Sequence, residues 1–156
     1  MLPAPGPPPL RPFGLILHHD GRWSHEGQWI QNPRLRAVFD RSVRYLPDEA
    51  VCVVQIGRFR GQIEVEEAAF FVRSYEPASG EMRLSDGSCE LLAVETLRPS
   101  PIDGALLCRV KVDQVPHGLE ARFAHSAQAE LLLAVEETPA GHCLRVAGAL
   151  RPLPEL

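Results

Sequence analysis

Four side chains of the types that ligate metals lie within one short segment of the chain: His18, His19, Asp20 and His25. The Asp20-Gly21 dipeptide is a strong signal for a two-residue β-hairpin turn of type I′. With that turn, His18 lies opposite Trp23 and shares one face of the ribbon with His25. The same face offers no third ligand, because Trp23 occupies the position across from His18. We therefore expect these residues to be polar side chains that cap a packed hairpin. A metal site at His18 and His25 is the alternative.

A second group of residues, which could do acid–base chemistry, consists of the carboxylates Glu64, Glu66 and Glu67. Alternation along a strand over 62–66 places Glu64 and Glu66 on one face. Paired carboxylates do acid–base work only when desolvation holds a proton on one of them near neutral pH. Nothing in the surrounding sequence predicts such desolvation. A solvated strand face is the favoured interpretation, with a salt bridge from this segment to an arginine.

The sequence offers no motif for nucleophilic catalysis. It contains no Gly-x-Ser-x-Gly, no P-loop and no Gly-x-Gly-x-x-Gly. Ser24 and His25 are adjacent, and adjacent side chains of a strand point to opposite faces, so these two cannot share a proton. We expect no catalytic residue and no cofactor.

The composition argues against several classes of partner. The chain has 156 residues, 45% of them apolar, and a net charge of −4. It can bury a core but has no global electrostatic reason to bind nucleic acid or an anionic membrane. A nucleic-acid surface is a third alternative, because basic residues gather on a predicted helix and in a later loop: Arg34, Arg36, Arg41, Arg44, Arg58 and Arg60.

The cysteines and the N-terminal residues indicate a cytoplasmic protein. Four cysteines occur without any C-x-x-C pair, and we expect all four to be buried core thiols in a reducing compartment. Prolines interrupt any signal-peptide pattern in residues 1–12, and no apolar run reaches the length of a membrane-spanning helix.

The elements that must position these residues are mostly strands. A strand over 15–19 leads into the turn at 20–21, and Glu26-Gly27 supplies a second reversal. Further strands are expected over 51–56, 62–66, 70–75, 81–84, 88–92, 106–112 and 143–150, with a hairpin at Asp86-Gly87.

Two amphipathic helices complete the set of elements. Asn32 is a natural N-cap and Pro33 a natural first helical residue. The apolar spacing from Leu35 onward predicts a helix that continues to Leu46, before a proline. A second helix is expected over 126–137.

Together these elements predict an α+β fold, with predominantly antiparallel β strands, two amphipathic helices and two half-motifs that suggest a structural repeat. We expect a proline-rich disordered tail over 1–12, an N-terminal half over 13–78 and a C-terminal half over 79–156. The two halves are expected to form a single compact unit over 13–153.

Several of these motifs together resemble a bacterial family, the domain of unknown function 1285. The family's first motif is similar to Asp20-Gly21-x-Trp23-x-His25-x-Gly27-x-x-Ile30, followed by a helix with Leu35 and Phe39. Later segments are similar to 63–70, to 118–122 with Glu130-Leu131, and to 148–153. The chain departs from the family at 56–60, where a Thr-Pro-x-Glu-Lys segment is usual, and at Ala69, where the family has a proline.

The resemblance implies a β-rich, two-part fold and a role in sensing or signal transduction, without catalytic residues. We therefore expect an uncharacterised, non-catalytic module that binds a small molecule or a protein partner. The residues expected at its binding site are Trp23, His25, Arg58, Glu66 and Arg122. A small metal-assisted enzyme that uses His18 and His25 is the alternative function.

Overall fold

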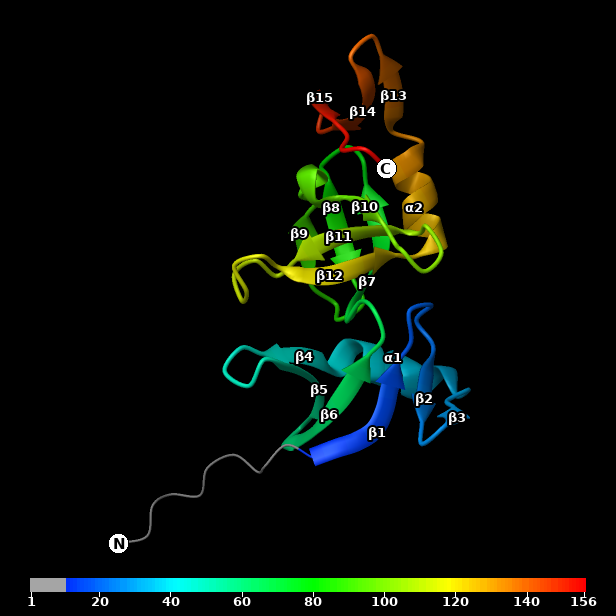
Figure 1. Cartoon of the computed structure of the whole chain (residues 1–156), viewed down its shortest axis with the longest axis vertical. Coiled ribbons are helices and arrows are strands. Elements are labelled where there is room, and N and C mark those ends of the chain that lie inside the picture. The colour runs from blue at the N-terminus through cyan, green and yellow to red at the C-terminus, as the bar shows by residue number, and fades with distance from the viewer. Residues whose placement is uncertain (1–10) are drawn as a thin grey trace, which may run out of the picture. The chain divides into compact units, whose positions relative to one another are not determined.

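The structure, a computed structural model, describes residues 11–156 (Figure 1). Its contacts divide the chain into two units, 1–66 and 67–156. The sequence interpretation places the division between 78 and 79; the two differ because strand β7 (Phe70–Glu76) pairs with strands of the second unit. Most of the proline-rich segment over 1–12 lies outside the described residues, although β1 already begins at Arg11. The single compact unit over 13–153 stays a prediction.

The first unit is built on a six-stranded sheet with the order β3-β2-β1-β6-β5-β4. All neighbours are antiparallel except β1 and β6, which run parallel. The strands are β1 (Arg11–Leu17), β2 (Trp23–His25), β3 (Gln28–Trp29), β4 (Val43–Leu46), β5 (Val51–Ile56) and β6 (Phe59–Val65).

The second unit repeats this strand order in the sheet β10-β11-β12-β7-β8-β9. In both sheets two three-stranded meanders lie side by side, and the first strand of one meander pairs in parallel with the last strand of the other. The further strands are β8 (Glu81–Leu84), β9 (Cys89–Leu91), β10 (Arg98–Pro99), β11 (Leu106–Val110) and β12 (Leu119–Phe123). The α+β class, the mostly antiparallel strands and the two half-motifs are thus confirmed.

Helix α1 (Pro33–Ser42) begins as the sequence predicts. The Asn32 side chain accepts hydrogen bonds from the backbone N–H of Arg34 and Leu35, at 3.0 and 3.3 Å. The predicted end at Leu46 is wrong, because residues 43–46 form β4 and pair with β5. Val43 is 1% exposed as a strand residue, so sheet pairing and burial outweigh the helical spacing.

Helix α2 (His125–Leu132) begins within one residue of its predicted start but ends five residues before the predicted end at 137. Residues 135–138 instead form β13 (Val135–Thr138), which belongs to a separate three-stranded sheet. The final strand predicted over 143–150 is in fact two strands, β14 (Gly141–Val146) and β15 (Ala149–Pro152). Ala147 and Gly148 turn between them with positive φ at both residues.

The thiols differ from their predicted burial. Cys108 is buried, Cys52 and Cys143 are half-buried, and Cys89 is exposed at the edge strand β9. The prediction that all four thiols are buried is therefore wrong. Burial raises the pKa of Cys108 to about 12 and that of Cys52 to about 11, which keeps both protonated at neutral pH. Within residues 11–156, neither helix has the length and apolar character that crossing a bilayer requires.

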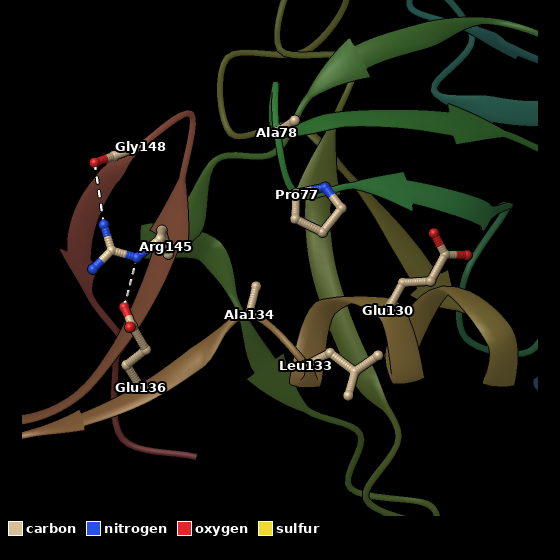
Figure 2. A pocket seen from close by; sticks show the side chains of 8 residues that line it. All are labelled: Pro77, Ala78, Glu130, Leu133, Ala134, Glu136, Arg145 and Gly148. Atoms are coloured by element: carbon tan, nitrogen blue, oxygen red, sulfur yellow. Dashed lines mark hydrogen bonds and ion pairs between the residues drawn. The ribbon is translucent and has the colours of Figure 1, made fainter.

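A cavity of about 450 Å³, wide open to solvent, lies in the second unit, where α2, the turn between β7 and β8, and the β13-β14-β15 sheet meet (Figure 2). Backbone hydrogen bonds tie its walls together: Arg145 N–H donates to the Ala134 carbonyl and Ala147 N–H to the Pro77 carbonyl, at 2.9 and 3.2 Å. The space is therefore part of the folded framework of this unit.

Candidate functional site

The first hairpin has a different register from the one expected for a type I′ turn. Leu17 pairs with Trp23 and Leu15 with His25. A type I′ turn needs positive φ at both central residues, but here only Gly21 has one, at 88°. His18 N–H donates to the Arg22 carbonyl at 2.8 Å, and Gly21 N–H donates to the His18 carbonyl at 3.0 Å. The loop therefore has three residues, not two.

This one-residue difference moves the side chains to other faces of the ribbon. Trp23 joins Leu15 and Leu17 on the buried face. His18 instead shares a face with Ser24, to which it is hydrogen-bonded. The predicted common face for His18 and His25 is wrong, because His25 pairs with Leu15 on the opposite side. The geometric basis for a metal site at His18 and His25 is thereby lost.

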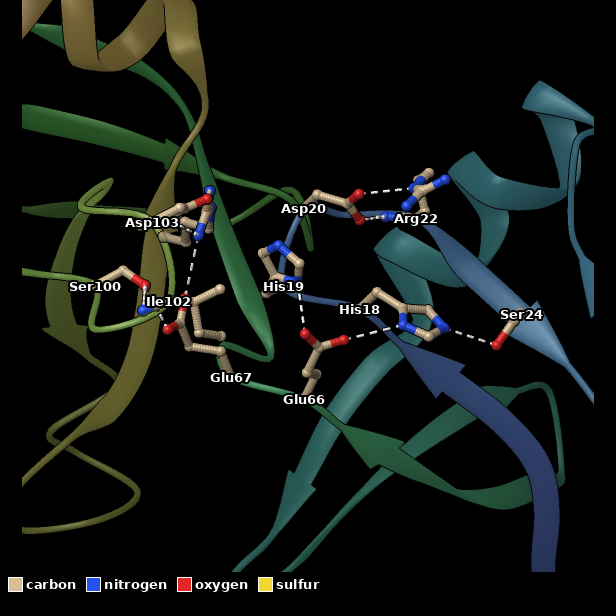
Figure 3. Close-up of polar contacts among 11 residues, drawn as sticks. His18, His19, Asp20, Arg22, Ser24, Glu66, Glu67, Ser100, Ile102 and Asp103 are labelled. Carbon is tan, nitrogen blue, oxygen red and sulfur yellow. Dashed lines mark hydrogen bonds and ion pairs between the residues drawn. The ribbon is translucent and has the colours of Figure 1, made fainter. Parts of the chain in front are cut away.

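Glu66 is the centre of a polar cluster on the His18 face (Figure 3). Its two carboxylate oxygens accept from Nδ1 of His18 at 3.0 Å and from Nδ1 of His19 at 2.5 Å. An ionised carboxylate only accepts hydrogen bonds, so Nδ1 carries the proton in both rings. The parallel pairing of β1 and β6 produces this contact, since Leu17 pairs with Val65 and the Glu66 N–H donates to the Leu17 carbonyl at 3.0 Å.

Ser24, His18 and Glu66 are hydrogen-bonded in the order found in hydrolases that activate a serine. The Ser24 hydroxyl lies 2.7 Å from Nε2 of His18. Ser24 is only 5% exposed, however, which leaves little room for a substrate to approach it. The interaction therefore fixes the tautomer and orientation of the His18 ring. Sequence reasoning considered Ser24 only with His25 and missed this pairing.

Trp29 is the exposed aromatic residue of the same face. It pairs with Ser24 across β2 and β3 and is 47% exposed. The His18 ring lies 4.6 Å from its ring, and the Arg22 guanidinium carbon lies 4.0 Å from the ring centroid. The Asp20 carboxylate holds Arg22 Nε at 2.7 Å. We call His18, His19, Arg22, Trp29 and Glu66 together the hairpin surface.

The structure distributes the predicted binding residues differently. Trp23 is fully buried, packs on Phe39 at 5.4 Å and donates from Nε1 to Asp40 at 2.8 Å. His25 is half-buried on the Trp23 face, and Arg58 is exposed in the turn between β5 and β6. Among the five, Glu66 alone belongs to the hairpin surface. The signal that could have found Trp29 is its position after the Glu26-Gly27 turn, which sets it opposite Ser24.

Arg122 is the centre of a separate cluster in the second unit. Its guanidinium binds the Asp103 carboxylate through two nitrogens and Glu67 Oε1 at 3.2 Å. The Ser100 hydroxyl donates to Glu67 Oε2 at 2.6 Å (Figure 3). The hydrogen bonds to Asp103 and Glu67 raise the pKa of Arg122 above its ordinary value, despite partial burial. The salt bridge expected from the 66–67 segment is thus formed by Glu67.

No group of three or more histidine, cysteine, aspartate or glutamate residues within 11–156 is arranged to hold a metal ion. Glu66 engages both of its histidines through Nδ1 hydrogen bonds, and Asp20 is engaged by Arg22. The arrangement can orient and present side chains at a surface.

Comparisons with known proteins agree with the family resemblance. A crystal structure of a DUF1285 family protein from Silicibacter pomeroyi DSS-3 superposes with a TM-score of 0.64 and 19% identity, covering 94% of this chain and 82% of that one. The chain has a DUF1285-like fold. A second DUF1285 family protein, from Shewanella baltica OS155, gives a TM-score of 0.51 and 12% identity over 77% and 91% of the two chains. No family model and no curated protein matches the sequence.

The Glu66 cluster makes stability depend on pH. Slight burial raises the pKa of Glu66. The hydrogen bonds from His19 and His18 lower this pKa by more than burial raises it, so the net shift is downward from 4.5. A lowered carboxyl pKa stabilises the fold above the unfolded-state pKa, and this stabilisation disappears as pH falls through the folded-state value. We expect Glu66→Gln to flatten the decrease in Tm between neutral pH and about pH 3, measured by thermal denaturation.

Glu64→Gln is the matched control for this measurement, because Glu64 lies two residues earlier and is exposed. Its pH profile should follow that of the wild-type protein. Identical profiles for Glu66→Gln and the wild type would contradict the assigned role of the cluster.

Proposed function

We propose that this protein is a non-catalytic binding module that recognises a protein partner through the hairpin surface and acts in regulation or signal transduction. The observation that carries the proposal is the presentation of Trp29, an indole that is 47% exposed yet contacts both His18 and Arg22. Tryptophan and arginine dominate the residues that contribute most to binding energy at protein interfaces.

The surface is organised before any partner arrives. Glu66 fixes both histidines, and Asp20 fixes Arg22, so the side chains around the indole have already lost much of their freedom. Binding through an ordered surface costs less conformational entropy than binding through a mobile one. The low exposure of Ser24, 5%, supports a recognition role over a hydrolytic one. The cytoplasm is the proposed location, on the basis of the sequence.

Photo-crosslinking in living cells tests this function. We expect a photoreactive residue at exposed Gln31, two positions after Trp29, to crosslink a discrete partner. Trp29→Ala should reduce that crosslink about tenfold or more, the effect typical of removing a central interface residue. A photoreactive residue at Leu91, which is 66% exposed in the second unit, is the control and should not capture the same partner. A crosslink that persists in Trp29→Ala would contradict the proposal.

A further inference from the structure

The cavity of the second unit shares no residue with the hairpin surface, and its lining is mainly apolar. Pro77 and Ala78 come from the turn between β7 and β8, and Leu133 and Ala134 from the end of α2. Leu133 is 87% exposed, so a large apolar side chain at the cavity lacks a protein neighbour to cover it. A volume of about 450 Å³ falls within the range of small-molecule sites.

Three charged side chains line this cavity. Arg145 is already engaged, since its Nε donates to Glu136 at 2.8 Å and its Nη1 to the Gly148 carbonyl at 3.3 Å (Figure 2). Glu130 is half-buried, and its carboxylate forms no hydrogen bond or ion pair with any described residue. The cavity therefore has a net charge of −1 from its ionised side chains, with Glu130 as the carboxylate left to bind a ligand.

From this arrangement we infer that the cavity binds an organic cation, an ammonium group on a short apolar body. The apolar body covers Leu133 and Ala134, and the ammonium donates to the Glu130 carboxylate. A neutral ligand would remove water from Glu130 without supplying a counter-charge, and a hydroxyl would replace only one of the lost hydrogen bonds, which costs free energy. An anion would meet the uncompensated carboxylate, because the one guanidinium of the lining already has a carboxylate partner.

The site does not need to be assembled on binding. Two backbone hydrogen bonds already join its walls. The β7–β8 turn also packs tightly on β14, because a Cβ added at Gly80 would lie only 2.7 Å from Cγ1 of Val146. Gly80 also has a φ of +79°, a backbone conformation that residues with a side chain rarely adopt. Because the wall is already ordered, the protein loses less conformational entropy when a small ligand binds.

Calorimetry with three probes of equal chain length tests the inference: n-hexylammonium, hexan-1-ol and hexanoate. The ammonium should bind the full-length protein about tenfold or more tightly than the alcohol, and hexanoate should not bind. Glu130→Gln should abolish the preference for the ammonium. Glu137→Gln is the matched control, because Glu137 is exposed on β13 outside the lining and should leave binding unchanged.

A second variant tests the place of binding. Ala134→Phe puts a ring into the cavity and should remove binding of the ammonium, with methyl resonances of Leu133 no longer shifting on titration. Equal affinity for the alcohol and the ammonium, an unchanged preference in Glu130→Gln, or binding that survives Ala134→Phe would each overturn the inference.

Discussion

An Arg122→Leu variant is expected to lose about 3–5 kcal/mol of the free energy of unfolding of the second unit, the usual cost of removing one partner from a buried ion pair. Arg122 is 8% exposed in the central strand β12. Without its guanidinium, Glu67, whose side chain is also 8% exposed, keeps one hydrogen bond from Ser100 but no counter-charge. Hydrogen exchange of the β7, β11 and β12 amides measures the loss in this unit.

Arg145→Leu provides the control for this variant. Arg145 and its partner Glu136 are both exposed, with 48% and 45% of their side chains accessible to solvent. Exposed ion pairs contribute about 1 kcal/mol or less to the free energy of unfolding. Adding Glu67→Gln and Asp103→Asn to Arg122→Leu should recover part of the lost stability, because no uncompensated charge then remains. Equal protection of the amides in the Arg122 and Arg145 variants would show that the buried cluster is not what holds these strands.

Local signals in the sequence identify most of the fold. The strands over 51–56, 70–76 and 81–84 follow from apolar runs and alternation, and the Asn32 cap follows from side-chain chemistry that needs no distant partner. The ends of both helices do not follow in this way. Residues 43–46 and 135–137 have helical spacing in the sequence but pair as strands, and that choice depends on neighbours elsewhere in the chain.

The hairpin surface was harder to predict because it depends on register and on parallel pairing. Asp20-Gly21 marks a turn, but the sign of φ at Asp20 decides between two and three loop residues, and with it which face His18 occupies. The Glu66 contact joins positions 48 residues apart in sequence. No local pattern announces it. Glu66 and Glu67 are adjacent in the sequence, yet they anchor clusters of two different units.

A Trp23→Ala variant is expected to lose about 3–5 kcal/mol of the free energy of unfolding of the first unit. The indole is fully buried against Phe39, and its removal leaves a large cavity and takes the Nε1 hydrogen bond from Asp40. Trp23→Phe should cost less, because the ring still fills much of the space. Urea unfolding by circular dichroism measures both, and emission of Trp29 assigns the transition, since the first unit contains both tryptophans.

Trp29→Ala is the matched comparison and separates folding from recognition. Trp29 is 47% exposed, so its removal should change stability by less than about 1 kcal/mol while it removes partner binding. The two tryptophans would then have opposite roles: Trp23 holds the hairpin onto α1, and Trp29 presents a surface on the other face of the same ribbon. A Trp29→Ala variant as unstable as Trp23→Ala would assign the exposed indole to the fold and leave the hairpin surface without its recognition residue.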